Sequence, residues 1–198
     1  MRVFVVDNKC GPGEHGQVMR DFIRMYNPSI LPILVNFQSE EYTEDLLIDL
    51  AESLGELVDV HDIVLITWSM AKNIAVDAAF AKLASYCTVV CAAGNNYGKM
   101  ASDYSPIGAP GVHIIGCINK RSEIASMSNV GNNVTYMFGT NMILPNSDGT
   151  VHGGTSVAAS IFTGLLSRSY RTREPSIFMR RAKRALQQRF LNELSNSV

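Results

Sequence analysis

The sequence predicts an α/β protein in which helices flank a mostly parallel central sheet. Short apolar segments rich in β-branched residues alternate along the chain with longer segments of helical period. The 198 residues are enough for one well-buried domain, and no low-complexity linker divides them. We therefore expect a single domain that spans residues 1–198.

The expected elements alternate in chain order. An apolar strand at residues 2–6 precedes a helix at 15–26, and a strand at 30–37 precedes a helix at 41–57. Strands at 62–68 and 87–92 flank a helix at 71–85, and strands at 112–118 and 134–138 precede helices at 155–169 and 175–194. Because strands and helices alternate, we expect buried strands covered by helices.

The composition excludes several classes of protein. The net charge of −1 gives no general attraction to nucleic acid or to acidic membranes. No apolar run approaches the roughly 20 residues that span a bilayer, and the N-terminus turns polar too early for a secretory signal. No cluster of acidic residues suggests a calcium site, and we expect no other metal and no cofactor.

The four cysteines are Cys10, Cys87, Cys91 and Cys117. They show neither the close spacing of a zinc site nor the density of a disulfide scaffold. Three of them lie in apolar, strand-like runs, so we expect reduced and buried thiols.

The expected helix at 175–194 belongs to a basic stretch that begins at Arg168 and holds eight Lys or Arg residues against two Glu. We favour a helix whose apolar residues, among them Phe178 and Leu186, pack on the core while the charges are solvated. The alternative is a docking face for an acidic protein partner, or for nucleic acid, which we expect less.

Four polar residues stand at strand ends or helix starts, where secondary structure does not require them: Asp7, His15, Asn95 and Ser156. A serine hydroxyl becomes a good nucleophile when an imidazole accepts its proton, and a carboxylate commonly holds that imidazole in one tautomer. An amide such as that of Asn95 can donate to an oxyanion, together with a backbone N–H at a helix start. Together, the four residues indicate acyl-transfer chemistry.

Taken alone, each of the four residues has a structural explanation, as a turn former, a strand end or a helix start. The segment HGGTSVAASIFTG, residues 152–164, favours catalysis. Its glycines, Gly153 and Gly154, lack the Cβ atoms that would keep substrate and backbone away from Ser156.

The same segments resemble the subtilisin family of serine proteases. The family's serine motif, Gly-Thr-Ser-Met-Ala and a small residue, is matched by GTSVAA at residues 154–159, and its Ala-Ala-Gly-Asn motif stands unchanged at residues 92–95. Its His-Gly pair is matched by His15-Gly16, and its first strand also ends in an aspartate. The resemblance covers residues 1–169 and implies a three-layer subtilisin-like fold.

The chain departs from the family pattern near the aspartate and the histidine. Asp7 is followed by Asn8 and Lys9 where the family commonly has Thr-Gly or Ser-Gly, and His15-Gly16 is not followed by Thr-His. Only seven residues separate Asp7 from His15, so a strand and loops of the family are missing between them. A loop of this length can still join a strand end to the next helix.

The resemblance implies a serine endopeptidase that acts on a protein or peptide. Ser156 would be the nucleophile, His15 the general base and then acid, Asp7 the group that orients the imidazole, and Asn95 an oxyanion donor.

The resemblance also implies residues that bind the substrate. Family members pair the substrate backbone with a segment that aligns with Ser69-Met70-Ala71, and the specificity pocket resembles the region of Gly94 and of Tyr104, Ser105 and Pro106. Tyr104 stands where the family often has glycine, so it would narrow the pocket and favour small residues before the cleaved bond.

Two other functions stay open. One is an interaction or assembly protein with the subtilisin fold and little or no proteolytic activity, and the other is an esterase with the same nucleophile. We expect a cytoplasmic protein, because the chain begins at its first strand without a signal peptide or pro-segment. A trimmed precursor and an intracellular or phage-type minimal form are both compatible with this start, and Met1 favours the second.

Overall fold

The core of the protein is a six-stranded sheet in which every pair of neighbouring strands is parallel. The structure is a computed structural model that describes residues 1–37, 41–145 and 147–171. The strands follow the order β2-β1-β3-β5-β7-β8 across the sheet. Their bounds are β1 Val3–Asp7, β2 Ile33–Asn36, β3 Ile63–Ile66, β5 Thr88–Ala92, β7 His113–Ile118 and β8 Val134–Phe138.

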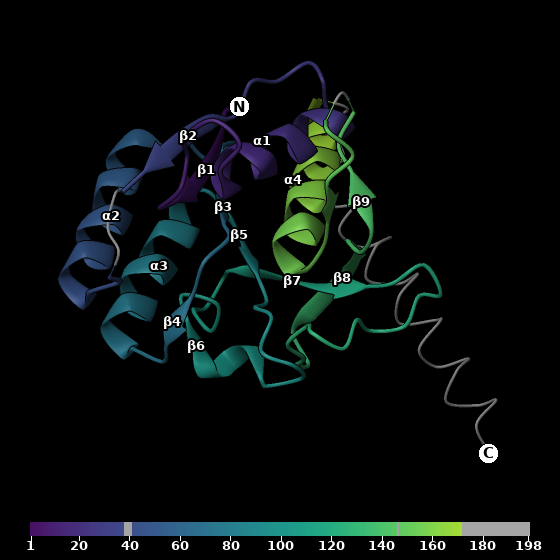
Figure 1. Cartoon of the computed structure of the whole chain (residues 1–198). Helices are drawn as coiled ribbons and strands as arrows, with labels where there is room; N and C mark the ends of the chain where they lie inside the picture. Colours follow the sequence, from purple (N-terminus) through teal and green to yellow (C-terminus); the bar gives the residue numbers. More distant parts are fainter. Residues whose placement is uncertain (38–40, 146, 172–198) are drawn as a thin grey trace.

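Two pairs of helices cover the two faces of the sheet (Figure 1). Helices α1 (His15–Tyr26) and α4 (Thr155–Arg171) pack together on one face, and α2 (Glu44–Leu57) and α3 (Ile74–Tyr86) pack together on the other. Alternate residues of each strand feed two separate apolar cores: in β1, Val3 and Val5 face α1 and α4, whereas Phe4 and Val6 face α2 and α3. This confirms the predicted three-layer architecture with a parallel sheet.

Helices α1 and α4 approach each other closely because Gly164 lies at their contact. A Cβ atom at this position would lie 2.7 Å from the carbonyl oxygen of Ile23. The glycine therefore lets α4 lie against α1, which fixes where the first turn of α4 meets the carboxyl edge of the sheet.

All six predicted strands and four of the five predicted helices are present, and the fifth, at residues 175–194, lies outside the described residues. Helices α2 and α3 begin three residues later than predicted because side chains cap them. Thr43 Oγ1 accepts a hydrogen bond from the backbone N–H of Leu46 at 3.4 Å, and Asn73 Oδ1 accepts one from Ala75 at 2.9 Å.

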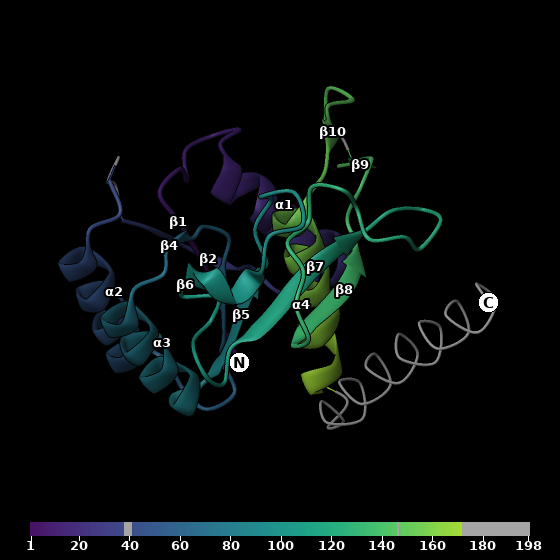
Figure 2. The ribbon, with the colours of Figure 1, turned by 90° about the horizontal axis from the view of Figure 1, so that it is seen from below.

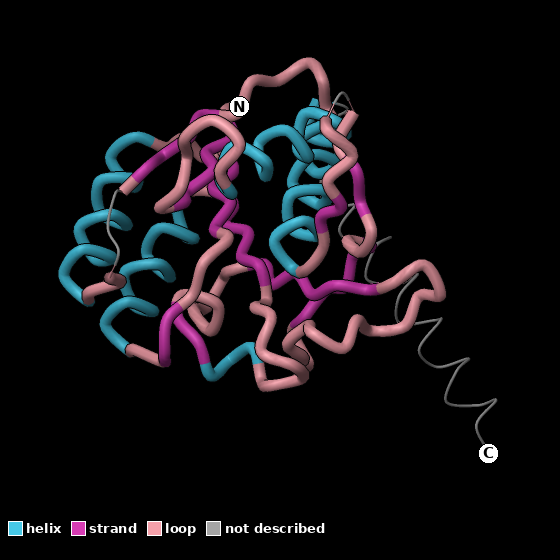
Figure 3. Tube along the Cα trace, in the orientation of Figure 1, coloured by secondary structure: helices cyan, strands magenta, loops and turns pink. Residues whose placement is uncertain are grey.

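Five short elements of the described residues were not predicted, four strands and one 3₁₀ turn. The two-residue strands β4 (Met70–Ala71) and β6 (Tyr104–Ser105) pair with each other, and so do β9 (Met142–Ile143) and β10 (Val151–His152). A 3₁₀ turn, η1, covers Ala101–Asp103. The β9–β10 pair projects from the body of the molecule (Figure 2), and mostly loop connects β5 to β7 (Figure 3).

None of the described helices is both long and apolar enough to cross a lipid bilayer.

Candidate active site

The short connection between β1 and α1 brings Asp7 and His15 into direct contact. Asp7 is buried, with 3% of its surface exposed, and its Oδ2 lies 2.6 Å from Nδ1 of His15. Gly16 makes the tight connection possible: its N–H donates to the carbonyl oxygen of Lys9 at 2.7 Å, and a Cβ there would lie 2.9 Å from the Cβ of Asp7. The seven-residue loop is therefore long enough to join the two side chains.

The surroundings of Asp7 keep its carboxylate ionised. Oδ1 accepts a hydrogen bond from the N–H of Lys9 at 2.9 Å, and Oδ2 accepts one from the hydroxyl of Thr67 at 2.6 Å. Burial raises the pKa of Asp7, but the hydrogen bonds from His15, Thr67 and Lys9 outweigh it, so the pKa lies below its ordinary value. An ionised carboxylate accepts from Nδ1–H of His15, which leaves Nε2 of a neutral ring as a proton acceptor.

Ser156 lies in the first turn of α4 and reaches the same group of residues through Thr67. Its side chain is largely buried, and its Oγ donates to the carbonyl oxygen of Thr67 at 3.4 Å. Within the described residues, no hydrogen bond joins Ser156 to His15. Thr67 thus contacts both Asp7 and Ser156, which places the serine beside the Asp7–His15 pair.

The amide of Asn95 is fixed over the start of α4. Its Oδ1 accepts hydrogen bonds from the N–H and the hydroxyl of Thr155, at 3.0 and 3.1 Å. Its Nδ2 has no hydrogen-bond partner in the described part of the chain, and Asn95 is exposed. The N–H of Ser156 belongs to the first turn, before the helix amides find acceptors four residues back. Among the described residues, the Nδ2 of Asn95 and the N–H of Ser156 are therefore two donors at the start of α4 without a hydrogen-bond acceptor.

Gly154 provides the space in which the Asn95 amide lies. Its φ is +114°, a conformation that residues with a side chain rarely adopt, and a Cβ there would lie 3.2 Å from both Nδ2 and Oδ1 of Asn95. The neighbour found at this glycine is an asparagine side chain, and the close approach of a substrate stays a prediction.

Asn129 holds the loop that carries Asn95. Its N–H donates to the carbonyl oxygen of Gly94 at 2.9 Å, and its side chain exchanges two hydrogen bonds with Asn96, at 2.9 and 3.0 Å. Gly94, with φ of +93°, leaves room for that side chain. Asn95 is thus held between two residues that are both bound to Asn129.

Sequence reasoning missed the supporting roles of Thr67, Thr155 and Asn129. Thr67 follows an apolar strand, so the signal that identified Asp7, a polar residue at a strand end, applies to it as well. Thr155 lies inside the segment at residues 152–164, but only the fold shows which groups Thr155 and Asn129 contact.

Most of the residues predicted to bind substrate lie where β4 pairs with β6, whereas Gly94 lies in the loop after β5. Met70 is opposite Ser105, and Ala71 is opposite Tyr104. Ser105 is fully buried and its hydroxyl donates to the carbonyl oxygen of Asn73 at 3.0 Å, so its side chain supports the start of α3. Tyr104 is half-buried against the core beneath α2 and α3. Contact of these residues, Ser69 and Gly94 with a substrate stays a prediction.

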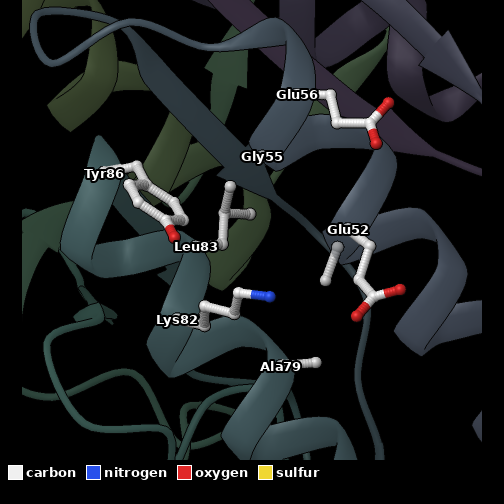
Figure 4. A pocket seen from close by; sticks show the side chains of 8 residues that line it. Glu52, Gly55, Glu56, Ala79, Lys82, Leu83 and Tyr86 are labelled. Carbon is white, nitrogen blue, oxygen red and sulfur yellow. The ribbon is translucent and has the colours of Figure 1, made fainter.

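The pocket drawn in Figure 4 lies away from these residues, between the outer surfaces of α2 and α3. It has a volume of about 330 Å³ and is lined by Glu52, Glu56, Lys82 and Tyr86 among others. A second hollow, of about 690 Å³, lies between the loop at 100–102 and residues 107–114 and 131–135. Neither contains Asp7, His15, Asn95 or Ser156.

The four cysteines are free thiols, and Cys87, Cys91 and Cys117 are buried, as predicted. Burial raises the pKa of Cys87 to about 12 and that of Cys117 to about 11. Across the described residues, no group of three or more His, Cys, Asp or Glu side chains is placed to hold a metal ion.

The fold is similar to those of several solved proteases. A cold-adapted subtilisin-like serine proteinase has a TM-score of 0.72 and 16% identity over 86% of this chain and 75% of its own. A lanthipeptide protease has a TM-score of 0.71 and 16% identity, over 87% of this chain and 74% of its own. The prenylagaramide maturation protease PagA has a TM-score of 0.59 and 18% identity, over 72% and 56%.

The sequence finds no match among curated proteins, but the model of the subtilase family matches residues 25–192. This match includes Asn95 and Ser156 and begins after Asp7 and His15. It covers most of the chain and agrees with the structural neighbours. The chain therefore belongs to the subtilase family and is a serine protease.

Proposed function

We propose that this serine protease is an endopeptidase in which Ser156 is the nucleophile, His15 the general base and Asp7 the group that orients the imidazole. The observation that carries the proposal is the 2.6 Å contact between the buried Asp7 carboxylate and Nδ1 of His15, with Ser156 bound to the neighbouring Thr67. Such an imidazole is held in the tautomer that can take a proton at Nε2.

The proposed reaction begins when the Ser156 hydroxyl turns from the Thr67 carbonyl to Nε2 of His15. Oγ attacks the peptide carbonyl carbon while Nε2 takes its proton, and Asp7 stabilises the imidazolium. Nδ2–H of Asn95 and the N–H of Ser156 donate to the oxyanion. His15 then returns the proton to the leaving amine, and water, activated by the same imidazole, hydrolyses the acyl-enzyme.

We further propose a peptide substrate whose backbone pairs with the segment at residues 69–71. Two structural neighbours are named as a lanthipeptide protease and as a maturation protease, which favours a peptide as the substrate class. Tyr104 would favour small residues before the cleaved bond. A peptide library cleaved efficiently after Phe or Leu would contradict this preference.

The nucleophile can be tested with a fluorophosphonate, which bonds through phosphorus to an activated serine oxygen and releases fluoride and the serine proton. We expect labelling at Ser156 that is lost in Ser156→Ala and His15→Ala and kept in Ser85→Ala, a change at an exposed serine near the end of α3. Labelling that survives His15→Ala would point to another base, and a wild type that is not labelled would refute the proposal.

One observation favours a second candidate, an interaction or assembly protein with little proteolysis. The Ser156 hydroxyl binds the Thr67 carbonyl and, among the described residues, makes no hydrogen bond to His15. Hydrogen bonds of this type are often formed only in the complex with substrate, so we prefer the protease. Turnover of casein or of a peptide pool that Ser156→Ala abolishes would exclude the second candidate. Turnover of small esters with no turnover of peptides would support the esterase.

A further inference from the structure

Thr67 lies between Asp7 and Ser156, the two ends of the proposed catalytic relay Asp7–His15–Ser156. It directly follows β3, and in the parallel pairing of β1 with β3 Val6 is the partner of Ile66, so Asp7 and Thr67 are the next residues along neighbouring strands. The register of the sheet therefore places the Thr67 side chain beside the Asp7 carboxylate at the carboxyl edge.

Thr67 and His15 bind the same oxygen of Asp7. The Thr67 hydroxyl donates to Oδ2 at 2.6 Å, and His15 Nδ1 lies 2.6 Å from that oxygen. The other oxygen, Oδ1, accepts from the N–H of Lys9. Because Oδ2 makes two short contacts, the Asp7 carboxylate cannot rotate freely, and the Thr67 hydroxyl stabilises part of its negative charge.

The backbone of Thr67 contacts the opposite end of the relay. Its carbonyl oxygen accepts the hydrogen bond of Ser156 Oγ at 3.4 Å. One residue thus sets the position of the carboxylate with its side chain and that of the resting nucleophile with its main chain.

We propose that Thr67 is a positioning residue of this protease, whose hydroxyl fixes the Asp7 carboxylate and moderates its attraction for the protonated His15 ring. The inference rests on the proposed function of Asp7, His15 and Ser156. Because Thr67 acts through Asp7, its loss should change the pH profile of the reaction as well as its rate.

The other titratable groups near Asp7 do not obscure that profile. The Cys10 thiol has a pKa raised to about 11, by burial first and then by the charges of Asp7 and Glu14, with Arg20 acting in the opposite direction. Burial and the charge of Asp7 also raise the pKa of Tyr42. Both groups are neutral over the acid side of the profile.

The test is the rate at which a fluorophosphonate labels Ser156, measured from about pH 5 to about pH 9, the range in which an imidazole changes its charge. In Thr67→Val we expect labelling to be about tenfold slower in the pH-independent region at high pH, because Oδ2 of Asp7 loses one of the two groups that fix it. We expect the acid limb to move up by about half a pH unit, because the carboxylate attracts the imidazolium more strongly. Thr67→Ser, which keeps the hydroxyl, should restore both.

A matched control is Thr163→Val on α4. Thr163 is fully buried, and its hydroxyl has no hydrogen-bond partner in the described part of the chain, so the same change of atoms should leave the rate and the acid limb unmoved. Circular dichroism verifies that each variant is folded, and Thr67→Ala replaces Thr67→Val if the valine is not accommodated.

The outcomes separate the inference from the proposed function. Three outcomes would overturn the inference and leave the proposed function intact. Thr67→Val could be labelled as fast as the wild type, its acid limb could stay or move to lower pH, or Thr67→Ser could fail to restore the rate. A wild type in which Ser156 is not labelled would overturn both.

Discussion

Gly154, the first residue of the serine motif, gives the sharpest test of how the site is built. In Gly154→Ala, the added Cβ would lie 3.2 Å from Nδ2 and Oδ1 of Asn95, on a backbone with φ of +114°. Contacts of 3.0–3.4 Å are tight enough that the neighbour must move by a few tenths of an ångström. We therefore expect the change to strain the backbone and to displace the proposed oxyanion donor at the same time.

The two effects have separate magnitudes. A side chain in this backbone region costs about 1–3 kcal/mol. At roughly 2–4 °C per kcal/mol for a domain of this size, a cost of about 2 kcal/mol lowers Tm by about 4–8 °C. Complete loss of an oxyanion donor slows the reaction by about 10²–10³, so a displaced donor should slow labelling of Ser156 by about 10–100-fold.

Two other glycines separate these effects. Gly153 has no positive φ, and a Cβ added there would lie 3.5 Å from its nearest neighbour, the carbonyl oxygen of Gly139. Gly153→Ala should therefore change the unfolding free energy by less than about 0.5 kcal/mol. Gly111 has φ of +84° and lies away from the site, so Gly111→Ala should lower Tm without slowing the labelling of Ser156. If Gly154→Ala labels as fast as Gly111→Ala, Asn95 does not depend on this glycine and the reasoning is refuted.

Three further predictions follow from the same geometry. Asn95→Ala should lower kcat by about 10²–10³ with KM little changed, whereas Asn133→Ala, at an exposed asparagine away from the site, should not; a proportional rise in KM would contradict an oxyanion role. Because folding lowers the pKa of Asp7, its ionised form stabilises the fold above about pH 4, and this stabilisation is lost as pH falls through the folded-state pKa. Asp7→Asn should therefore flatten the acid decline of the unfolding free energy in urea titrations. The Cys87 and Cys117 thiols should react with a thiol reagent at neutral pH only after unfolding, because burial raises the pKa of both.

The strands and long helices could be predicted because local periodicity and burial determine them. Each predicted strand is found within three residues of its expected bounds, since apolar runs bounded by polar residues leave few alternatives. The pairing of Asp7 with His15 could be predicted as well, because a strand end and the next helix start are joined by a short loop. In these cases the information lies within a few residues of the element it specifies.

The supporting contacts could not be predicted because they join distant segments. Thr67 contacts Asp7, 60 residues before it, and Ser156, 89 residues after it. The short strands β4 and β6 carry no periodic signal in two residues each, and their pairing depends on the path of the loop after β5. Only the order of strands in the sheet brings these residues together.

The order of the strands also explains why the site tolerates so short a connection between its aspartate and its histidine. Asp7 ends β1, Thr67 directly follows β3, and Asn95 lies three residues after β5; these three strands are neighbours in the sheet. Neighbouring strands lie about 4.8 Å apart, so the ends of β1 and β5 are roughly 10 Å from each other across the edge, with the end of β3 between them. Helix α4 packs against β3 and β5, and its first turn brings the Ser156 hydroxyl to the carbonyl oxygen of Thr67 at the end of β3. The spacing of these three strand ends is thus set by hydrogen bonding between strands, and the loop before His15 has only to place one imidazole beside Asp7.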